Sequence, residues 1–185
     1  TWTAPTNTTG SQQTCTIQVV VSDGQGLSQS PSYPQGVSAT APTARLINLS
    51  TRAQVGTGPD QVIAGFIIEG DSPKTILVRA LGPTLGLPPF NVPGALPNPV
   101  LTLFAGQTAI AQNDAWQVPD PLCASSGHTC GDAAAIVATD LAPPDPQEAA
   151  ILITLNPGPY TAIVSGAGGL TGVGLVEVYE VATAP

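Results

Sequence analysis

The sequence predicts an all-β protein: an antiparallel β-sandwich of jelly-roll-like topology, preceded by an extended N-terminal strand or arm. Only 9% of the residues are charged, whereas glycine and proline contribute 20 residues each. This composition is typical of short strands joined by Gly/Pro turns and argues against coiled coils and helical bundles. The apolar fraction of 42% is too high, and the charge too low, for a disordered chain.

Residues 1–43 are predicted to form the arm. Within it, residues 14–22 alternate between apolar and polar side chains and end at the turn Asp23-Gly24, which is the pattern of a half-buried strand. Residues 24–43 read as a linker with three prolines, so the arm offers this orphan strand no partner. Pairing in cis with the following domain, pairing in trans with a neighbouring subunit, and truncation of a larger module all remain open.

Residues 44–185 are predicted to form the sandwich domain. We expect strands at residues 46–50, 62–68, 74–80, 100–104, 108–111, 150–155, 160–165 and 173–181. The turn signals predict three hairpins, which join the second strand to the third, the fourth to the fifth, and the sixth to the seventh. The continuous apolar run 62–68 suggests a central strand covered on both faces. One helix is expected, with Asp132 as its N-cap.

The cysteines indicate an exported protein. Cys123 and Cys130 bracket six residues of a loop rich in small and polar residues, which favours a local disulfide over two free thiols. Zinc is a poor alternative, because His128 alone does not complete a four-ligand set. The remaining Cys15 indicates an intermolecular disulfide or a buried thiol. We therefore expect an extracellular or cell-surface location.

The net charge of −8 argues against two classes of partner. Nucleic-acid binding depends on a basic patch that releases counterions, and only four lysines and arginines are present. No apolar run approaches the ~20 residues of a membrane-spanning helix. We expect neither nucleic-acid binding nor membrane insertion.

The sequence shows no constellation typical of an active site, so we predict that the protein is not an enzyme. His128 lies near Ser125 and Ser126, but the Gly-x-Ser-x-Gly motif of a hydrolase is absent. Asx residues in loops usually bond to their own backbone, although one group offers oxygen ligands for Ca²⁺: Asn113, Asp114, Asp120 and Asp132. We expect no cofactor, with Ca²⁺ as the alternative.

Two residues of the domain indicate structural roles. Arg79 interrupts an apolar strand, and a buried charge without a partner is costly. Glu69 and Glu177 are its candidate partners, and we predict a structural ion pair with Glu177. Trp116 is expected to fill a core beneath its loop rather than to form a sugar-binding platform, because the chain has few aromatic residues.

Two stretches of the chain resemble known families. Trp2-Thr3-Ala4-Pro5 followed by residues 17–26 resembles the closing strands of an immunoglobulin-like module of the cadherin or PKD type. The second stretch is carried by residues 44–52 and 74–83, by Asn113-Asp114 with Trp116, and by residues 155–164 and 174–179. As a unit, residues 44–181 resemble a β-rich domain common near the C-termini of large secreted and cell-surface bacterial proteins. That family has no assigned catalytic residues, so the resemblance implies an exported, non-catalytic module.

These observations predict a non-catalytic extracellular structural subunit that acts through protein–protein contacts. Its expected partners are copies of itself, in a homo-oligomer or filament, or neighbouring modules of a larger surface protein. The expected contact is donation of strand 14–22 to a neighbour, which is a head-to-tail contact that builds fibres. The side chains expected to enter the neighbour are Cys15, Ile17, Val19 and Val21. The alternative is a carbohydrate-binding or adhesive surface module of a larger secreted protein.

Overall fold

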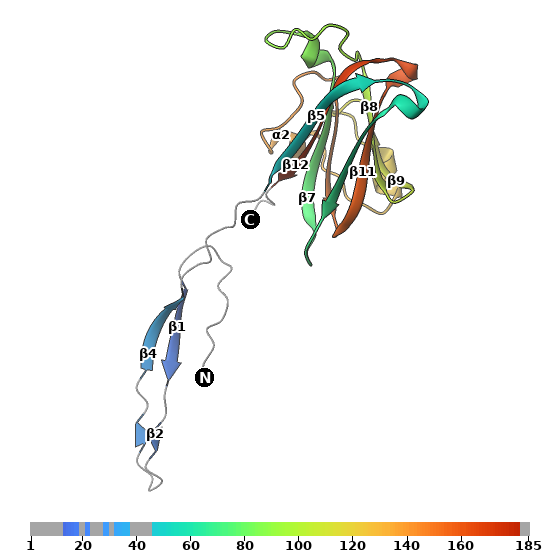
Figure 1. Ribbon diagram of the computed structural model, residues 1–185. Helices are drawn as coiled ribbons and strands as arrows, with labels where there is room; N and C mark the ends of the chain where they lie inside the picture. Colours follow the sequence, from blue (N-terminus) through green and yellow to red (C-terminus); the bar gives the residue numbers. More distant parts are fainter. Residues whose placement is uncertain (1–12, 19–20, 23–27, 30–31, 38–45, 182–185) are drawn as a thin grey trace. The chain divides into compact units, whose positions relative to one another are not determined.

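The computed structural model describes residues 13–18, 21–22, 28–29, 32–37 and 46–181. The chain divides into two compact units, Thr1–Arg45 and Leu46–Pro185, and strands dominate the described residues of both (Figure 1). Short helices join some of the strands: η1 (Gly58–Asp60), η2 (Pro83–Gly86), α1 (Pro121–Ser125), α2 (Ala133–Val137) and η3 (Ala167–Gly169).

The first unit contains paired strands rather than one orphan strand. β1 (Gln13–Gln18) pairs antiparallel with β4 (Ser32–Val37), and β2 (Val21–Ser22) pairs with β3 (Ser28–Gln29). The prediction that the arm offers this strand no partner is therefore wrong. Pro34 lies within β4, where it pairs with Thr16. Proline is tolerated where its ring does not replace a needed N–H donor, as on an edge, and this is why the sequence pattern concealed β4.

The second unit is a sandwich of two antiparallel four-stranded sheets, as predicted. The first, which we call sheet I, has the order β10-β7-β12-β5 and contains β5 (Asn48–Val55), β7 (Lys74–Leu81), β10 (Ala149–Leu155) and β12 (Gly172–Val181). The second, sheet II, has the order β6-β11-β8-β9 and contains β6 (Val62–Ile68), β8 (Pro99–Ala105), β9 (Thr108–Asn113) and β11 (Gly158–Gly166). Each strand predicted for this domain is present.

The chain crosses between the two sheets at every connection of the sandwich except the one between β8 and β9. This alternation is the strand order of a jelly roll. The predicted hairpin of β8 with β9 is confirmed. The other two predicted hairpins are wrong, because β6 and β7 lie in different sheets, and so do β10 and β11. A turn signal indicates where the chain reverses, but it does not indicate whether the next strand pairs with the last or crosses to the facing sheet.

The main core lies between the sheets and is built from alternate residues of each strand. Sheet I contributes Ile76, Val78, Ala80, Ile151, Ile153 and Val176, and sheet II contributes Leu101, Leu103, Ala162 and Val164. A smaller cluster covers the outer face of sheet I, where Leu77, Ala150 and Leu152 pack against Trp116 and Ile136. Trp116 thus fills a core beneath its loop, as predicted, and its Nε1 donates a hydrogen bond to the Asp145 carbonyl at 3.1 Å.

Strand β6 differs from its prediction, because it is an edge strand with one face buried. Val62, Ala64 and Phe66 pack against the core, whereas Ile63 and Ile67 are 61% and 70% exposed. The prediction of a central strand covered on both faces is wrong. A short apolar run has no visible period, so it does not reveal which of its residues face water.

Candidate functional site

Arg79 and Glu177 form an ion pair on neighbouring strands of sheet I. The Nε of Arg79 donates to Oε2 of Glu177 at 2.9 Å, and the two side chains are 11% and 10% exposed. Nη1 of Arg79 donates to the Leu141 carbonyl at 2.6 Å, and Nη2 donates to the Tyr179 hydroxyl at 3.1 Å. The guanidinium therefore fastens the chain at Leu141 to the sheet, which is a structural role.

The Tyr179 hydroxyl completes this cluster. It donates a hydrogen bond to Oε1 of Glu177 at 2.9 Å. Burial raises the pKa of Tyr179 above its ordinary value, and the hydrogen bond to Glu177 raises it further. The cluster of Arg79, Glu177 and Tyr179 is thus a closed network in which each polar group has a partner.

The insert between β9 and β10, residues 114–148, covers the edge of β9. Oδ2 of Asp120 accepts a hydrogen bond from the Gln112 N–H at 2.7 Å. The hydroxyl of Ser126 donates to the Ile110 carbonyl at 2.7 Å. These bonds occupy backbone groups that an edge strand otherwise presents to another chain.

The same insert covers the edge of β10. The Gly131 N–H of the insert donates to the Leu152 carbonyl at 2.8 Å, and the Ala150 N–H donates to Oδ1 of Asn113, the last residue of β9, at 3.1 Å. Cys130 also forms an isolated bridge with Ile153. We call the edges of β9 and β10, together with the insert, the capped side of the sandwich.

A disulfide between Cys123 and Cys130 lies within the insert, which we also call the cap, and holds it together with an S–S distance of 2.03 Å. Cys123 belongs to α1, which lies beside β9, whereas Cys130 lies beside β10. The disulfide therefore links the cover of one sheet edge to the cover of the other.

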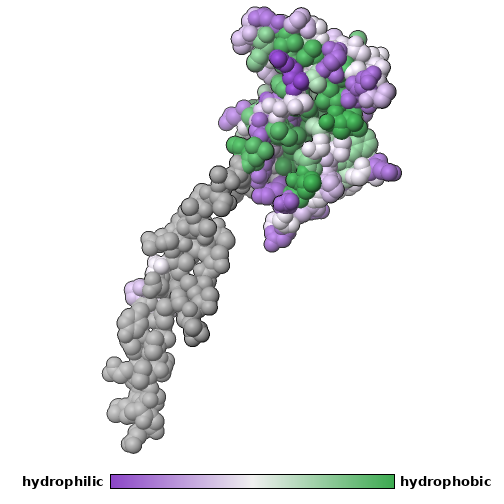
Figure 2. Space-filling view, viewed as in Figure 1, coloured by the Kyte–Doolittle hydropathy of each residue, from purple (hydrophilic) through white to green (hydrophobic). Residues whose placement is uncertain are grey.

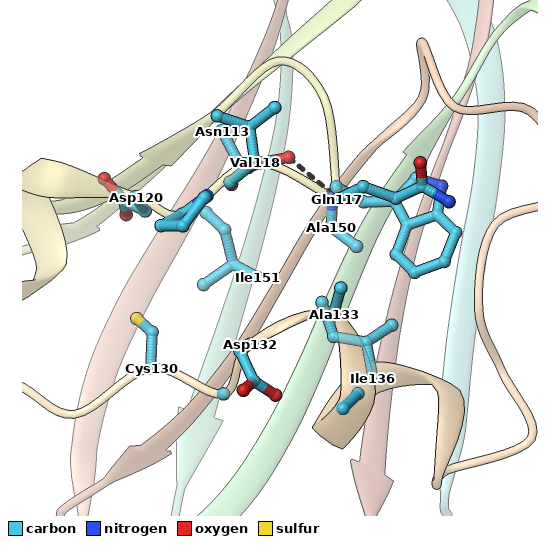
Figure 3. A pocket seen from close by; sticks show the side chains of 14 residues that line it. Asn113, Gln117, Val118, Asp120, Cys130, Asp132, Ala133, Ile136, Ala150 and Ile151 are labelled. Carbon is cyan, nitrogen blue, oxygen red and sulfur yellow. Dashed lines mark hydrogen bonds between the residues drawn. The ribbon is translucent and has the colours of Figure 1, made fainter.

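Three of the four candidate calcium ligands, namely Asn113, Asp120 and Asp132, form hydrogen bonds with backbone groups. These three line a pocket of about 160 Å³ on the capped side, and the carboxylates of Asp120 and Asp132 lie well apart there (Figure 3). Asp120 caps α1 by accepting from the Leu122 N–H at 2.8 Å, and Asp132 caps α2 by accepting from the Ala135 N–H at 2.9 Å. Asp114 is exposed and does not line the pocket. The predicted N-cap at Asp132 is confirmed, and α1 is a helix that the sequence analysis missed.

Asp120, Cys123 and Cys130 bring carboxylate and sulfur atoms within 4.8 Å of one another. The two sulfurs are bonded to each other, so neither is a thiolate that binds a metal. His128 lies beside this group, and its Nδ1 is 3.0 Å from Oγ of Ser126. The same hydroxyl donates a hydrogen bond to the Ile110 carbonyl of β9 at 2.7 Å, so Ser126 connects the insert to β9.

Glu148 is a buried polar residue that the sequence analysis missed. Its side chain is fully enclosed, at 0% exposure. Oε1 accepts from the N–H groups of Gly82 and Thr84 at 3.1 and 3.0 Å, and Oε2 accepts from the Asp145 N–H at 3.3 Å. Backbone donors thus replace water around this carboxylate, which ties the chain after β7 to the end of the insert. No sequence pattern distinguishes such a glutamate from a surface residue.

The edges of β5 and β6 form the opposite side of the sandwich, which we call the open side. Within residues 46–181, no loop donates to or accepts from the free edge of either strand. Large apolar side chains with exposures of 54–77% lie here instead: Leu46, Ile47, Leu49, Ile63 and Ile67. Figure 2 shows this face of the sandwich with several patches of hydrophobic residues in green.

The open side is hollowed between β5 and β6. Two adjoining hollows of about 240 and 230 Å³ share Leu49 and Val178. The first is also lined by Phe66 and Ile76 and by the ion pair of Lys74 with Glu180, whose atoms are 2.9 Å apart. The second is also lined by Thr51, Ala64 and Val176. Successive hollows along a strand edge suit the alternate side chains of an added strand.

The residues predicted to enter a neighbouring subunit fall in the first unit. Cys15 and Ile17 belong to β1 and Val21 belongs to β2, while Val19 lies outside the described residues. β1 pairs with β4 along one edge only, within the described residues. The other edge of β1 has no strand partner among those residues, so it is the edge that can pair with a neighbouring sheet.

Comparison with known proteins assigns no function to the capped side or to the open side. Comparisons with protein-family models, curated proteins and solved structures find no match for this chain. In the part of the chain that the structure describes, no helix has the length and apolar character needed to cross a membrane. Function is therefore inferred from the contrast between the capped and the open side.

Proposed function

We propose that the protein is a non-catalytic structural module of an extracellular or cell-surface assembly and acts through contacts with other proteins. The observation that carries this proposal is the difference between the two sides of the sandwich. The insert satisfies backbone groups of β9 and β10, whereas β5 and β6 border exposed apolar residues and two hollows. An apolar patch beside unpaired strand edges is the usual mark of a protein-binding surface.

The cysteine chemistry supports the proposed location. The bond between Cys123 and Cys130 is structural, because it holds the cap over both sheet edges. Structural disulfides persist in oxidising compartments and are rare in the cytosol. The resemblance of residues 44–181 to a domain of secreted and cell-surface proteins supports the same location.

A non-catalytic role is supported by the structural contacts that the candidate catalytic side chains make. Asp120 and Asp132 cap helices, Ser126 and His128 belong to the cap, and Glu148 is enclosed by backbone donors. A catalytic group needs a free proton-transfer or nucleophilic position in a cleft. The hollows of the open side are lined mainly by apolar side chains, which suits packing rather than chemistry.

We propose in addition that the arm joins neighbouring subunits. β1 donates its second edge to a neighbouring subunit, so the donated element is the β1–β4 hairpin rather than a lone strand. A two-stranded hairpin is marginally stable by itself, and addition to a sheet stabilises it. β5 and β6 both offer an edge, and repeated head-to-tail addition builds a filament.

Sedimentation of the full chain over a range of concentrations, with electron microscopy of the same samples, tests this function. We expect self-association that Leu49→Lys weakens at least tenfold. Val137→Lys is the matched control, because Val137 lies on the capped side and is 53% exposed, against 54% for Leu49. Equal association of both variants and the parent contradicts a role for the open side. Removal of residues 1–45 tests the arm, and unchanged oligomers would rule out donation.

The carbohydrate-binding alternative has less support in the described residues. Trp116 is buried, and Phe90, at 57%, is the one exposed aromatic side chain that the structure describes. Glycan arrays and calorimetry distinguish the two functions, because a structural module should bind no glycan. Saturable glycan binding that Phe90→Ala abolishes would establish the alternative.

A further inference from the structure

We propose that β6 pairs antiparallel with β6 of a second copy of this chain, so that sheet II continues across two subunits. This inference rests on the proposed function, because it names a partner for the open side. It does not depend on the arm, and β5 remains free for the β1–β4 hairpin.

The first observation is that β6 lacks the protection that edge strands usually carry. Natural edges are blunted by charges, prolines, bulges or a covering loop. β6 has no charged residue and no proline, and its ladder with β11 is regular over residues 62–68. β5 carries Arg52, and the insert covers β9 and β10. Among the four edges of the described sandwich, β6 is the unprotected one.

The second observation is that the sequence of β6 is complementary to itself. Its residues read Val-Ile-Ala-Gly-Phe-Ile-Ile, with Gly65 at the centre. When two copies run antiparallel about Gly65, Ile63 lies opposite the partner's Ile67, and Ala64 lies opposite the partner's Phe66. Apolar residues thus face apolar residues on both sides of Gly65, and the small Ala64 faces the large ring of Phe66. Such cross-strand pairs are the unit of sheet stabilisation.

This register also keeps the two faces of the sheet continuous. Ile63 and Ile67 lie on the exposed face of β6, whereas Ala64 and Phe66 pack against the core. Paired positions in the proposed register are both exposed or both core-facing, so each face meets the same face of the second copy. A slip by one residue would place exposed residues opposite core-facing ones. The contact is therefore isologous, as expected for a two-fold dimer.

The third observation concerns charge. The chain carries a net charge of −8, so two copies repel each other at low ionic strength. β6 is an uncharged stretch through which two such chains can approach. Salt screens the repulsion between the charges that remain. We therefore expect dimerisation to become stronger, not weaker, as the salt concentration rises.

Cysteine cross-linking of the full chain tests the register. We place Gly65→Cys in a Cys15→Ser background, which removes the cysteine outside the disulfide. A Cβ at Gly65 meets only the Tyr160 carbonyl oxygen, at 4.0 Å, so the variant should fold. Facing Cα atoms in an antiparallel pair are about 4.5 or 5.5 Å apart, which is within the range of a disulfide. We expect a covalent dimer under mild oxidation.

Two matched variants on the same strand are the controls. Ile63→Cys alone should not form a dimer, because the two copies of position 63 would lie about 13 Å apart along the strands, beyond disulfide range. A mixture of the Ile63→Cys and Ile67→Cys proteins should form the mixed dimer. Cross-linking of Ile63→Cys to itself, or no cross-link at Gly65→Cys, overturns the proposed register.

Sedimentation supplies a second readout that does not depend on cysteine chemistry. Ile67→Lys should weaken dimerisation at least tenfold, whereas Val118→Lys, on the capped side at 58% exposure, should not. Dimerisation that Ile67→Lys leaves unchanged overturns the inference. If Leu49→Lys still weakens association in that case, the proposed function stands and only the β6 contact is wrong. If neither lysine variant has an effect, both fail.

Discussion

Oδ1 of Asn113, at the end of β9, accepts a hydrogen bond from the backbone N–H of Ala150 in β10 at 3.1 Å. The bond joins an edge of sheet II to an edge of sheet I, so it closes the sandwich on the capped side. Nδ2 of the same amide donates to the carbonyls of Ala115 and Val118, at 3.2 Å each. One buried side chain thus satisfies backbone groups of both a sheet and the insert.

Asn113→Asp should lower the free energy of unfolding by about 1–3 kcal/mol at pH 7. The replacement removes two donors and turns a carboxylate oxygen toward two carbonyl oxygens in a site that is 7% exposed. Urea unfolding measures the loss. Asn156→Asp, at an exposed turn, is the control for the added charge. Equal losses in the two variants would show that the Asn113 bonds contribute nothing.

Replacing Cys123 and Cys130 together by serine should lower the free energy of unfolding by roughly 2–3 kcal/mol at most, because the loop that the bond closes is short. Intact mass before and after reduction should show two added hydrogens in the parent protein and none in the variant. Cys15→Ser is the control for the loss of a cysteine. Two alkylatable thiols at Cys123 and Cys130 in the native protein would contradict the prediction.

Arg79→Met and Glu177→Leu should each lower the free energy of unfolding by about 3–5 kcal/mol, because each leaves the other charge buried without its partner. The double variant removes both charges and should cost less than the sum of the two single changes. Chemical denaturation of the four proteins gives the coupling energy. Additive effects would mean that the two side chains do not stabilise each other.

The Tyr179 hydroxyl should make stability depend on alkaline pH. Its pKa is raised in the folded protein, whereas an unfolded tyrosine ionises near pH 10. Above that pH the folded state binds more protons than the unfolded state, so the free energy of unfolding falls as the pH rises. The stabilisation is complete below about pH 10 and is lost through the folded-state pKa.

Urea unfolding of the parent and of Tyr179→Phe, at pH 8 and between about pH 10 and 11.5, measures this dependence. The parent should lose stability with rising pH relative to the phenylalanine variant. Tyr160→Phe controls for the loss of a phenol at another site. Parallel curves for the parent and Tyr179→Phe would exclude the effect.

The strands were predictable because each carries its own local pattern, whereas their pairing was not. Residues 62–68 and 74–80 read as a hairpin because Gly70 and Pro73 mark a reversal between them, but in the structure the two strands belong to facing sheets. Their partners come from residues 149–181, far along the chain. The choice between pairing and crossing depends on burial against those distant strands, which no local turn encodes.

The contacts of the capped side could also be predicted only in part from the sequence. The spacing of Cys123 and Cys130 indicated a local loop, and Asp132 was recognisable as a cap. That the loop hydrogen-bonds the edges of β9 and β10 depends on positions such as Gln112 and Leu152, which carry no signal by themselves. The open side was hidden for a related reason, because the exposure of Ile63 and Ile67 is set by β6 being an edge strand.

The cap also sets the valency of the sandwich, which is the number of its sides that are available to associate with another subunit. With β9 and β10 occupied, and leaving the arm aside, the open side is the one side of the described sandwich left for the proposed association, and one such side per subunit would yield closed pairs. A subunit with two such sides has no reason to stop at two and propagates into open arrays. Reduction of the Cys123–Cys130 bond would loosen the cover from both edges and raise the valency from one to two. Under the proposed function, formation of this bond would therefore limit association through the sandwich edges to pairs, and growth beyond pairs would depend on the arm.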